Sequence, residues 1–128
     1  MKILLDTHIF LWFVGGDPAL SAGSRAAVES PENERLLSVA SVWEMAIKVS
    51  LGKLTLPGDF GSFVASQMDA NDIALLGVEM AHTTGVVGLP FHHRDPFDRL
   101  LIAQAIAEQI PIVSQDRLFD AYPVTCIR

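Results

Sequence analysis

The sequence has little cysteine and little charge. Cys126 is the only cysteine among 128 residues, which excludes a disulfide within the chain and a zinc site built from several thiolates. Charged residues make up only 19% of the chain, against 50% hydrophobic residues. Because a small domain with this composition is expected to expose apolar surface to a partner, we predict a homodimer.

An excess of basic residues and a long apolar segment are also missing. The chain has 9 Lys and Arg against 15 Asp and Glu, a formal net charge of −6. That balance argues against tight non-specific binding of nucleic acid, but not against an enzyme whose carboxylates surround a cation. The apolar run that ends at Asp6 is too short for a signal peptide or a membrane span. We therefore expect a soluble, cytoplasmic protein.

Short apolar segments alternate with amphipathic ones, and no linker or repeat divides the chain. This pattern predicts one domain, residues 1–128, of the α/β class with a mainly parallel sheet covered on both faces. Ligands bind such sheets beyond the carboxyl ends of the strands. The expected strands are 3–5, 36–39, 111–114 and 124–127, with 73–76 as a further candidate, and the main expected helices are 9–14, 42–51, 60–68, 79–87 and 98–109.

Four acidic residues fall near the predicted carboxyl edge of the sheet. Asp6 follows the first strand and Asp116 follows the fourth. Glu44 lies in the first turn of the helix after the second strand, and Asp98 starts the long helix. Converging carboxylates repel one another, so a cation must neutralise them or their pKa values must rise. Mg²⁺ and Mn²⁺ prefer such oxygen ligands and can activate water for attack on a phosphodiester.

Each acid also has a simpler interpretation. Asp6 and Asp98 can be helix N-caps, and Asp116 can start a turn. Glu44 can be the second half of a capping box with Ser41. The argument for a shared site rests on all four acids reaching one edge, and it does not separate a nuclease from a phosphatase.

Four segments closely resemble the PIN-domain family, in the order and spacing of the VapC-type toxins. They are residues 4–8 (LLDTH), 41–48 (SVWEMAIK), 93–105 (HRDPFDRLLIAQA) and 114–116 (SQD). The similarity covers essentially the whole chain, and the segment around Asp98 is its most specific part. The resemblance implies a PIN-like three-layer α/β/α sandwich.

The resemblance also implies a function. It implies an endoribonuclease dependent on Mg²⁺ or Mn²⁺ that acts as the toxin of a type II toxin–antitoxin pair. Such a protein is a homodimer that cuts RNA and is silenced by a small VapB-like antitoxin. The acidic positions of the family match Asp6, Glu44, Asp98 and Asp116, with Asp6 and Asp98 expected to bind the metal. Thr7 and Ser114 match supporting hydroxyl positions.

Several residues beside the acids are further candidates. We predict that Arg94 and Arg99 contact RNA phosphates, since cations near the acids offset the negative charge locally. Three other side chains are candidates for the same role: His93, Arg117 and Lys48. For Lys48, a solvated or ion-paired state is favoured. The pair His92-His93 does not favour zinc, because no cysteine joins it. Asp95, before Pro96, is interpreted as a turn residue outside the metal set.

Two other features leave alternatives open. Phe10, Trp12 and Phe13 make the first helix apolar on more than one face, which suits either core packing or an interface. Another phosphoryl-transfer enzyme is the alternative activity, but an aspartyl-phosphate phosphatase needs a second Asp where this chain has His8. An inert binding module on the same fold is disfavoured by the complete set of four acids.

Overall fold

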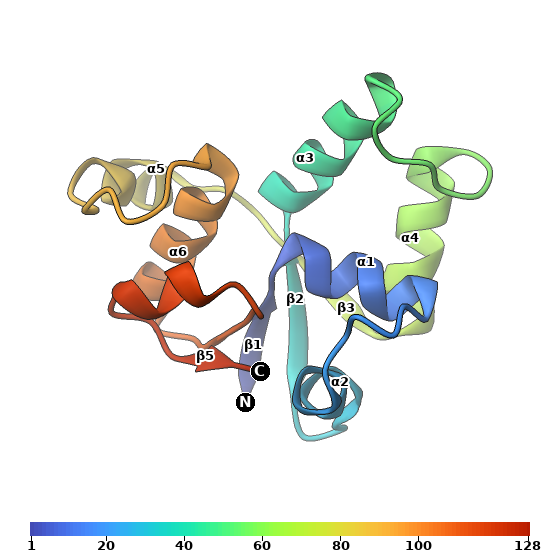
Figure 1. Cartoon of the computed structure of the whole chain (residues 1–128), viewed down its shortest axis with the longest axis horizontal. Coiled ribbons are helices and arrows are strands. Elements are labelled where there is room, and N and C mark those ends of the chain that lie inside the picture. Colours follow the sequence, from blue (N-terminus) through green and yellow to red (C-terminus); the bar gives the residue numbers. More distant parts are fainter.

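A computed structural model describes all 128 residues and shows a five-stranded sheet (Figure 1). The strand order is β3-β2-β1-β4-β5, and every neighbouring pair is parallel. The predicted α/β class is therefore confirmed. The strands are β1 (Lys2–Leu5), β2 (Glu34–Ser38), β3 (Ile73–Leu76), β4 (Ile112–Val113) and β5 (Cys126–Ile127).

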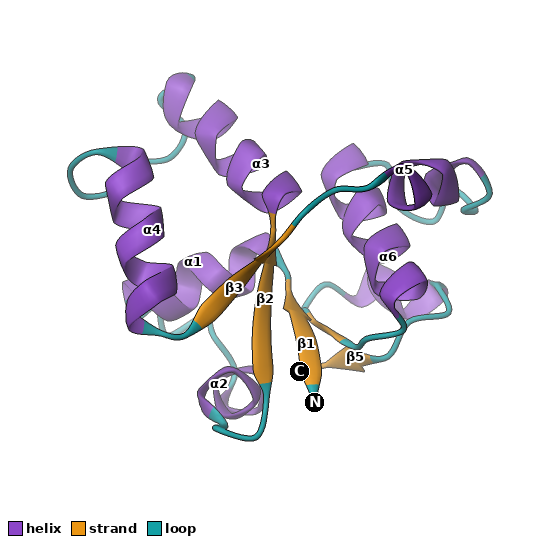
Figure 2. Ribbon diagram, turned by 180° about the vertical axis from the view of Figure 1, so that it is seen from behind, coloured by secondary structure: helices purple, strands orange, loops and turns teal.

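Helices cover both faces of this sheet (Figures 1 and 2). One side carries α1 (Thr7–Gly15), α2 (Ala22–Glu29), α3 (Val39–Ser50) and α4 (Phe60–Ala70). The other carries α5 (Met80–Val87), α6 (Pro96–Glu108) and the 3₁₀ helix η1 (Arg117–Ala121). This arrangement is the predicted three-layer α/β/α sandwich. None of these helices has both the length and the apolar character needed to cross a bilayer.

The central position of β1 in the sheet explains why its residues are apolar without alternation. Successive side chains of a strand point to opposite faces of the sheet. Ile3 and Leu5 pack into the core on the side of α1, while Leu4 packs into the core against α6. All three side chains are completely buried, so β1 needs an apolar residue at every position and ends where Asp6 begins the site.

Helix α3 begins three residues earlier than expected. Ser38 is its N-cap, since the Ser38 hydroxyl accepts a hydrogen bond from the backbone N–H of Ala40 at 3.0 Å. The predicted capping box between Ser41 and Glu44 is wrong, because both residues lie inside the helix. The cap comes instead from the last residue of β2, so the strand passes into the helix without a loop.

Helix α6 begins two residues earlier than expected, at Pro96. The carboxylate of Asp95 accepts hydrogen bonds from the backbone N–H groups of Phe97 and Asp98, at 2.8 and 3.2 Å. Proline suits the first helical position because it has no N–H that needs a partner. Asp95 is therefore the N-cap of α6, which leaves Asp98 in the first turn with its side chain free for another role.

Candidate active site

The structure brings the four predicted acids together at the carboxyl edge of the sheet. Helices α1, α3 and α6 begin on this side, which is uppermost in Figure 1. Burial raises the pKa of Asp98, and the nearby charges of Asp6, Asp95, Glu44 and Asp116 raise it further, to about 8. Four other acids therefore lie close enough to Asp98 for their charges to act on it, which places the predicted acids around one site.

Asp6 occupies the N-cap position of α1, but its carboxylate does not cap the helix. One oxygen, Oδ2, accepts a hydrogen bond from the hydroxyl of Ser114 at 2.9 Å. The other, Oδ1, is buried and has no hydrogen-bond partner. Burial raises the pKa of Asp6, while the bond from Ser114 lowers it. A buried carboxylate oxygen without a partner is costly, so this atom suits contact with a bound cation.

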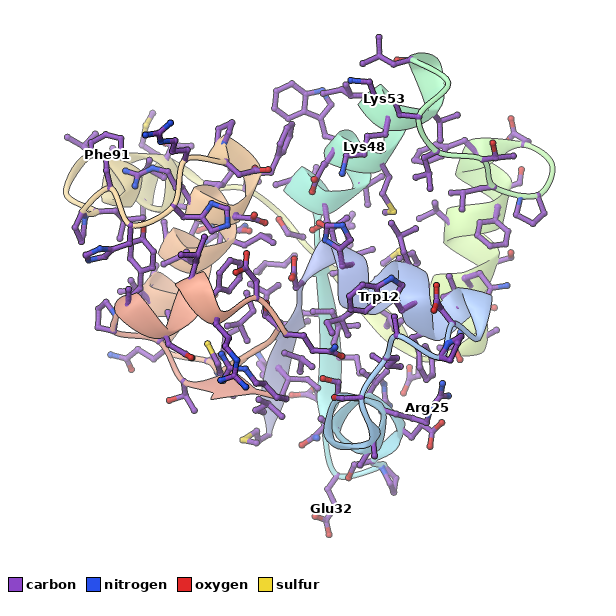
Figure 3. The ribbon with its side chains drawn as sticks, in the orientation of Figure 1. Trp12, Arg25, Glu32, Lys48, Lys53 and Phe91 are labelled. Carbon is purple, nitrogen blue, oxygen red and sulfur yellow. The ribbon has the colours of Figure 1, made fainter.

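Glu44 is held by a chain of hydroxyl groups. The Thr7 hydroxyl lies 2.8 Å from both Glu44 Oε1 and Ser41 Oγ. Because Thr7 has only one hydroxyl proton, we infer that it donates to the Glu44 carboxylate while Ser41 donates to Thr7. On its other side, Glu44 Oε2 lies 3.2 Å from the ammonium of Lys48, which extends from α3 (Figure 3). Lys48 is thus ion-paired, as its favoured interpretation expected.

Asp98 and Asp116 share a partner that the sequence left undecided, the imidazole of His93. His93 Nε2 lies 3.0 Å from Asp98 Oδ2 and 2.9 Å from Asp116 Oδ2. Asp116 Oδ1 also accepts the backbone N–H of Leu118 at 2.9 Å, so Asp116 caps η1 as well as lining the site. The sequence around His92 and His93 does not show which of them reaches the acids, because the conformation of their loop turns His93 inward.

The oxygens that remain free fit a divalent cation. Glu44 and Asp116 each use both carboxylate oxygens in contacts with protein groups. Asp6 Oδ1 has no partner, and Asp98 engages protein groups only through Oδ2. Mg²⁺ and Mn²⁺ prefer anionic oxygens of this kind, so Asp6 Oδ1 and the second oxygen of Asp98 are the atoms of the site that remain available to such an ion.

The side chain of Arg99 is not available at the surface for contact with an RNA phosphate. Its side chain is buried, and the guanidinium donates to the backbone carbonyl oxygens of Pro90, Leu89 and Val86 at 2.8 to 3.3 Å. The ring of Phe91 lies 4.1 Å from the guanidinium carbon. The predicted RNA contact of Arg99 is therefore wrong, because its donors are already used to hold the loop between α5 and α6. Arg94, by contrast, is exposed and forms no ion pair.

A cleft of about 360 Å³ adjoins the acids. It is lined by Asp6, His8, Trp12, Gln115 and Asp116, and Trp12 lies on α1 in Figure 3. Of the aromatic residues of α1, Phe10 is fully buried and belongs to the core, whereas Trp12 is half-buried. Core packing therefore accounts for Phe10, and Trp12 borders the site.

A profile of the PIN domain matches residues 3–124. The chain belongs to the PIN-domain family. This PIN domain is also similar to the ribonuclease VapC16 of Mycobacterium tuberculosis, with 43% identity over 60 residues. That match spans 47% of this chain and 43% of the relative's length.

Solved structures agree with the fold of this PIN domain. VapBC2 from Rickettsia felis, bound to a DNA fragment from its promoter, aligns with a TM-score of 0.71 at 16% identity, over 98% of this chain and 97% of that one. FitAcB from Neisseria gonorrhoeae aligns with a TM-score of 0.65 at 18% identity, over 98% and 96% of the two chains. At these identities the likeness shows the fold alone.

Proposed function

We propose that the protein is an endoribonuclease dependent on Mg²⁺ or Mn²⁺. The observation that carries the proposal is the unpartnered, buried oxygen of Asp6 within a group of four mutually repelling acids. RNA as the substrate is supported by membership of the PIN family and by similarity to a relative named as a ribonuclease. The acids alone would suit any phosphoryl-transfer enzyme, and similarity to this relative favours nucleic acid over a smaller phosphate ester as the substrate.

Asp6 and Asp98 would hold the ion through their free carboxylate oxygens. The ion would neutralise the acids and supply a water of lowered pKa beside the phosphate. Glu44, fixed by Thr7 and Lys48, would add negative charge beside the ion, and a lone pair of its carboxylate would accept a proton from the attacking water. Water would form the new P–O bond as the bond from phosphorus to the 3′ oxygen breaks, and the departing 3′ oxygen would take a proton from solvent water. The products are a 5′-phosphate on one fragment and a 3′-hydroxyl on the other.

The protein's cations would bind the flanking phosphates. Arg94 and Arg117 are exposed, and each is adjacent in sequence to a residue of the site. Local positive charge of this kind can attract RNA even though the whole chain has a net charge of −6. We therefore propose that Arg94 and Arg117, and not the buried Arg99, contact the RNA phosphates.

We further propose that the protein is the toxin of a VapBC-like pair, acts in the cytoplasm and forms a homodimer. Solved complexes described as VapBC2 and FitAcB share its fold, which supports a small antitoxin as partner. Exposed apolar side chains on α3 and α5 support a dimer, since Trp43, Met80 and Val87 are between 61% and 87% exposed.

One assay tests the catalytic proposal. Protein purified free of antitoxin is incubated with structured RNAs, with Mg²⁺ or Mn²⁺ and with EDTA. We expect cleavage only with the metal, and its loss in Asp6→Asn. Asp17→Asn, which removes the charge of a half-buried acid after α1 and keeps an oxygen for the Ala19 N–H, is the control for the change in charge. Cleavage that persists in EDTA, or equal cleavage by Asp6→Asn, would overturn the proposal.

A further inference from the structure

His93 lies between two acids of the site, and its distances allow two different roles. Its Nε2 is 3.0 Å from Asp98 Oδ2 and 2.9 Å from Asp116 Oδ2. The three ligand atoms lie close enough together to hold an ion, since neighbouring ligands about 2.1 Å from an octahedral ion are about 3 Å apart. The same distances suit hydrogen bonds from one imidazole N–H.

The second ring nitrogen decides between these roles. His93 Nδ1 lies 3.2 Å from the backbone nitrogen of Asp95, whose N–H is directed at it. A backbone amide only donates, so Nδ1 must be an unprotonated acceptor, and the neutral ring carries its proton on Nε2. Histidines that bind metals usually donate from their other nitrogen to a carboxylate or carbonyl group. Here that nitrogen faces a donor, which leaves Nε2 as an N–H group and not as a ligand.

The loop that carries His93 is held in place by the elements that carry the two acids. The His93 backbone N–H donates to the hydroxyl of Tyr122 at 2.8 Å, and this hydroxyl donates to the Pro90 carbonyl oxygen at 2.8 Å. Arg99, the residue after Asp98, donates to the same Pro90 oxygen. The His93 ring also packs edge-on against Phe119 of η1, with centroids 5.8 Å apart. These contacts fix the ring from both sides.

We propose that His93 is a positioning residue whose Nε2–H group donates to the Oδ2 atoms of Asp98 and Asp116. By holding these oxygens it leaves the other oxygen of Asp98 free to bind the ion together with Asp6 Oδ1. The first ligands are then oxygens alone, which suits Mg²⁺ and Mn²⁺ better than metals that favour nitrogen. This inference rests on the proposed metal-dependent function and defines how that site is built.

Mn²⁺ binding to the full-length protein tests the proposal without measuring activity. Electron paramagnetic resonance gives the affinity for Mn²⁺, and its pulsed form detects a nitrogen atom bonded directly to the ion. His93→Gln retains an N–H donor at about the reach of Nε2, whereas His93→Leu removes it. We expect His93→Leu to bind Mn²⁺ about 10- to 100-fold more weakly, and His93→Gln to recover most of that loss. His92→Gln, an exposed neighbour, is the matched control.

Two results would overturn the proposal. A nitrogen coupling in the wild-type spectrum that disappears in His93→Gln would make His93 a ligand. Equal Mn²⁺ affinity in His93→Leu and the wild type would remove its positioning role. Circular dichroism checks that each variant is folded.

Nitrogen NMR of the metal-free protein gives a separate measurement. We expect His93 to be protonated on Nε2 and unprotonated on Nδ1, whereas a protonated Nδ1 would overturn the assignment. Because this spectrum needs neither metal nor RNA, it distinguishes failure of the His93 proposal from failure of the proposed ribonuclease function.

Discussion

The two halves of the acidic site are built differently. Asp6 and Glu44 are almost completely buried and receive hydrogen bonds from the hydroxyl groups of Ser114 and Thr7. Asp98 and Asp116 are more open, with side chains 17% and 35% exposed, and they share one imidazole from a loop. One half is therefore fixed by the strand ends, and the other by a loop that must itself be anchored.

This difference teaches that the site depends on residues whose side chains do not line it. Arg99 and Tyr122 hold the loop of residues 88–95, and this loop carries His93. Figure 3 shows Phe91, which covers Arg99, at the outer end of the same loop. Damage to the strand-end half should remove catalysis directly. Damage to the loop half should act through stability and the position of His93.

The largest expected effect is from Asp6→Asn, which breaks the buried half. Loss of an anionic metal ligand removes several kcal/mol of transition-state stabilisation, so we expect RNA cleavage to fall at least ~100-fold. The metal-free protein should not lose stability, because the amide removes the charge from a buried group whose Oδ1 atom has no partner, while its oxygen can still accept the bond from Ser114. Cleavage kinetics and thermal melting measure the two effects. A large fall in the melting temperature without metal would contradict this account of Asp6.

Arg99→Met disturbs the half of the site that contains Asp98 and Asp116. The substitution removes the buried donor of the Leu89 carbonyl oxygen and one of the two donors of the Pro90 carbonyl oxygen, so we expect a loss of about 2–4 kcal/mol in the free energy of unfolding. Urea denaturation measures this loss. Arg94→Met is the matched control and should leave stability unchanged. If Arg99→Met instead weakened RNA binding without destabilising the protein, the phosphate contact predicted from the sequence would be restored.

The pH dependence of stability tests the half with Asp98, whose pKa is raised to about 8, while burial also raises the pKa of Asp6 in the other half. The ordinary value of 3.8 applies when the chain is unfolded. Between these values the folded protein keeps a proton that the unfolded chain releases. The stability of the metal-free protein should therefore fall as the pH rises from about 4 to 8. Melting in EDTA across this range should show a smaller fall for Asp98→Asn, and a slope equal to that of the wild type would contradict the assignment.

The smallest effect is expected from Arg94→Gln. An exposed cation contributes about 0.5–1 kcal/mol to a phosphate contact, so KM for RNA should rise about 2- to 5-fold with kcat nearly unchanged. Raising the salt concentration should reduce the difference. A variant with the wild-type KM at low salt would remove Arg94 from the substrate contacts.

Much of the fold could be predicted from the sequence. The predicted strands 3–5 and 36–39 correspond to β1 and β2, because their Ile and Leu side chains pack into the cores on the two faces of the sheet, although Val39 already belongs to α3. The exact ends of the helices could not be predicted, because several polar residues near the start of α3 and of α6 are suitable caps. Only the structure shows that Ser38 and Asp95 are the caps, and this result left Glu44 and Asp98 available for the site.

The acids of the site could be predicted because the carboxyl ends of parallel strands meet at one edge. The partners of the acids could not. Arg94 and Arg99 look alike in sequence, yet one is exposed and the other buried among carbonyl oxygens. His92 and His93 are likewise adjacent, and the path of their loop decides which of them reaches Asp98. Loop conformation depends on contacts between residues that are distant in sequence, so a local sequence pattern does not predict it.

The most direct test of the central claim is the chemical identity of the RNA ends. Purified protein cuts a labelled RNA in Mg²⁺ or Mn²⁺, and the fragments are analysed for their terminal groups. Hydrolysis by water at a carboxylate-bound ion predicts 5′-phosphate and 3′-hydroxyl ends, and no cleavage in EDTA. Fragments with 2′,3′-cyclic phosphates, or the same products formed in EDTA, would contradict the account.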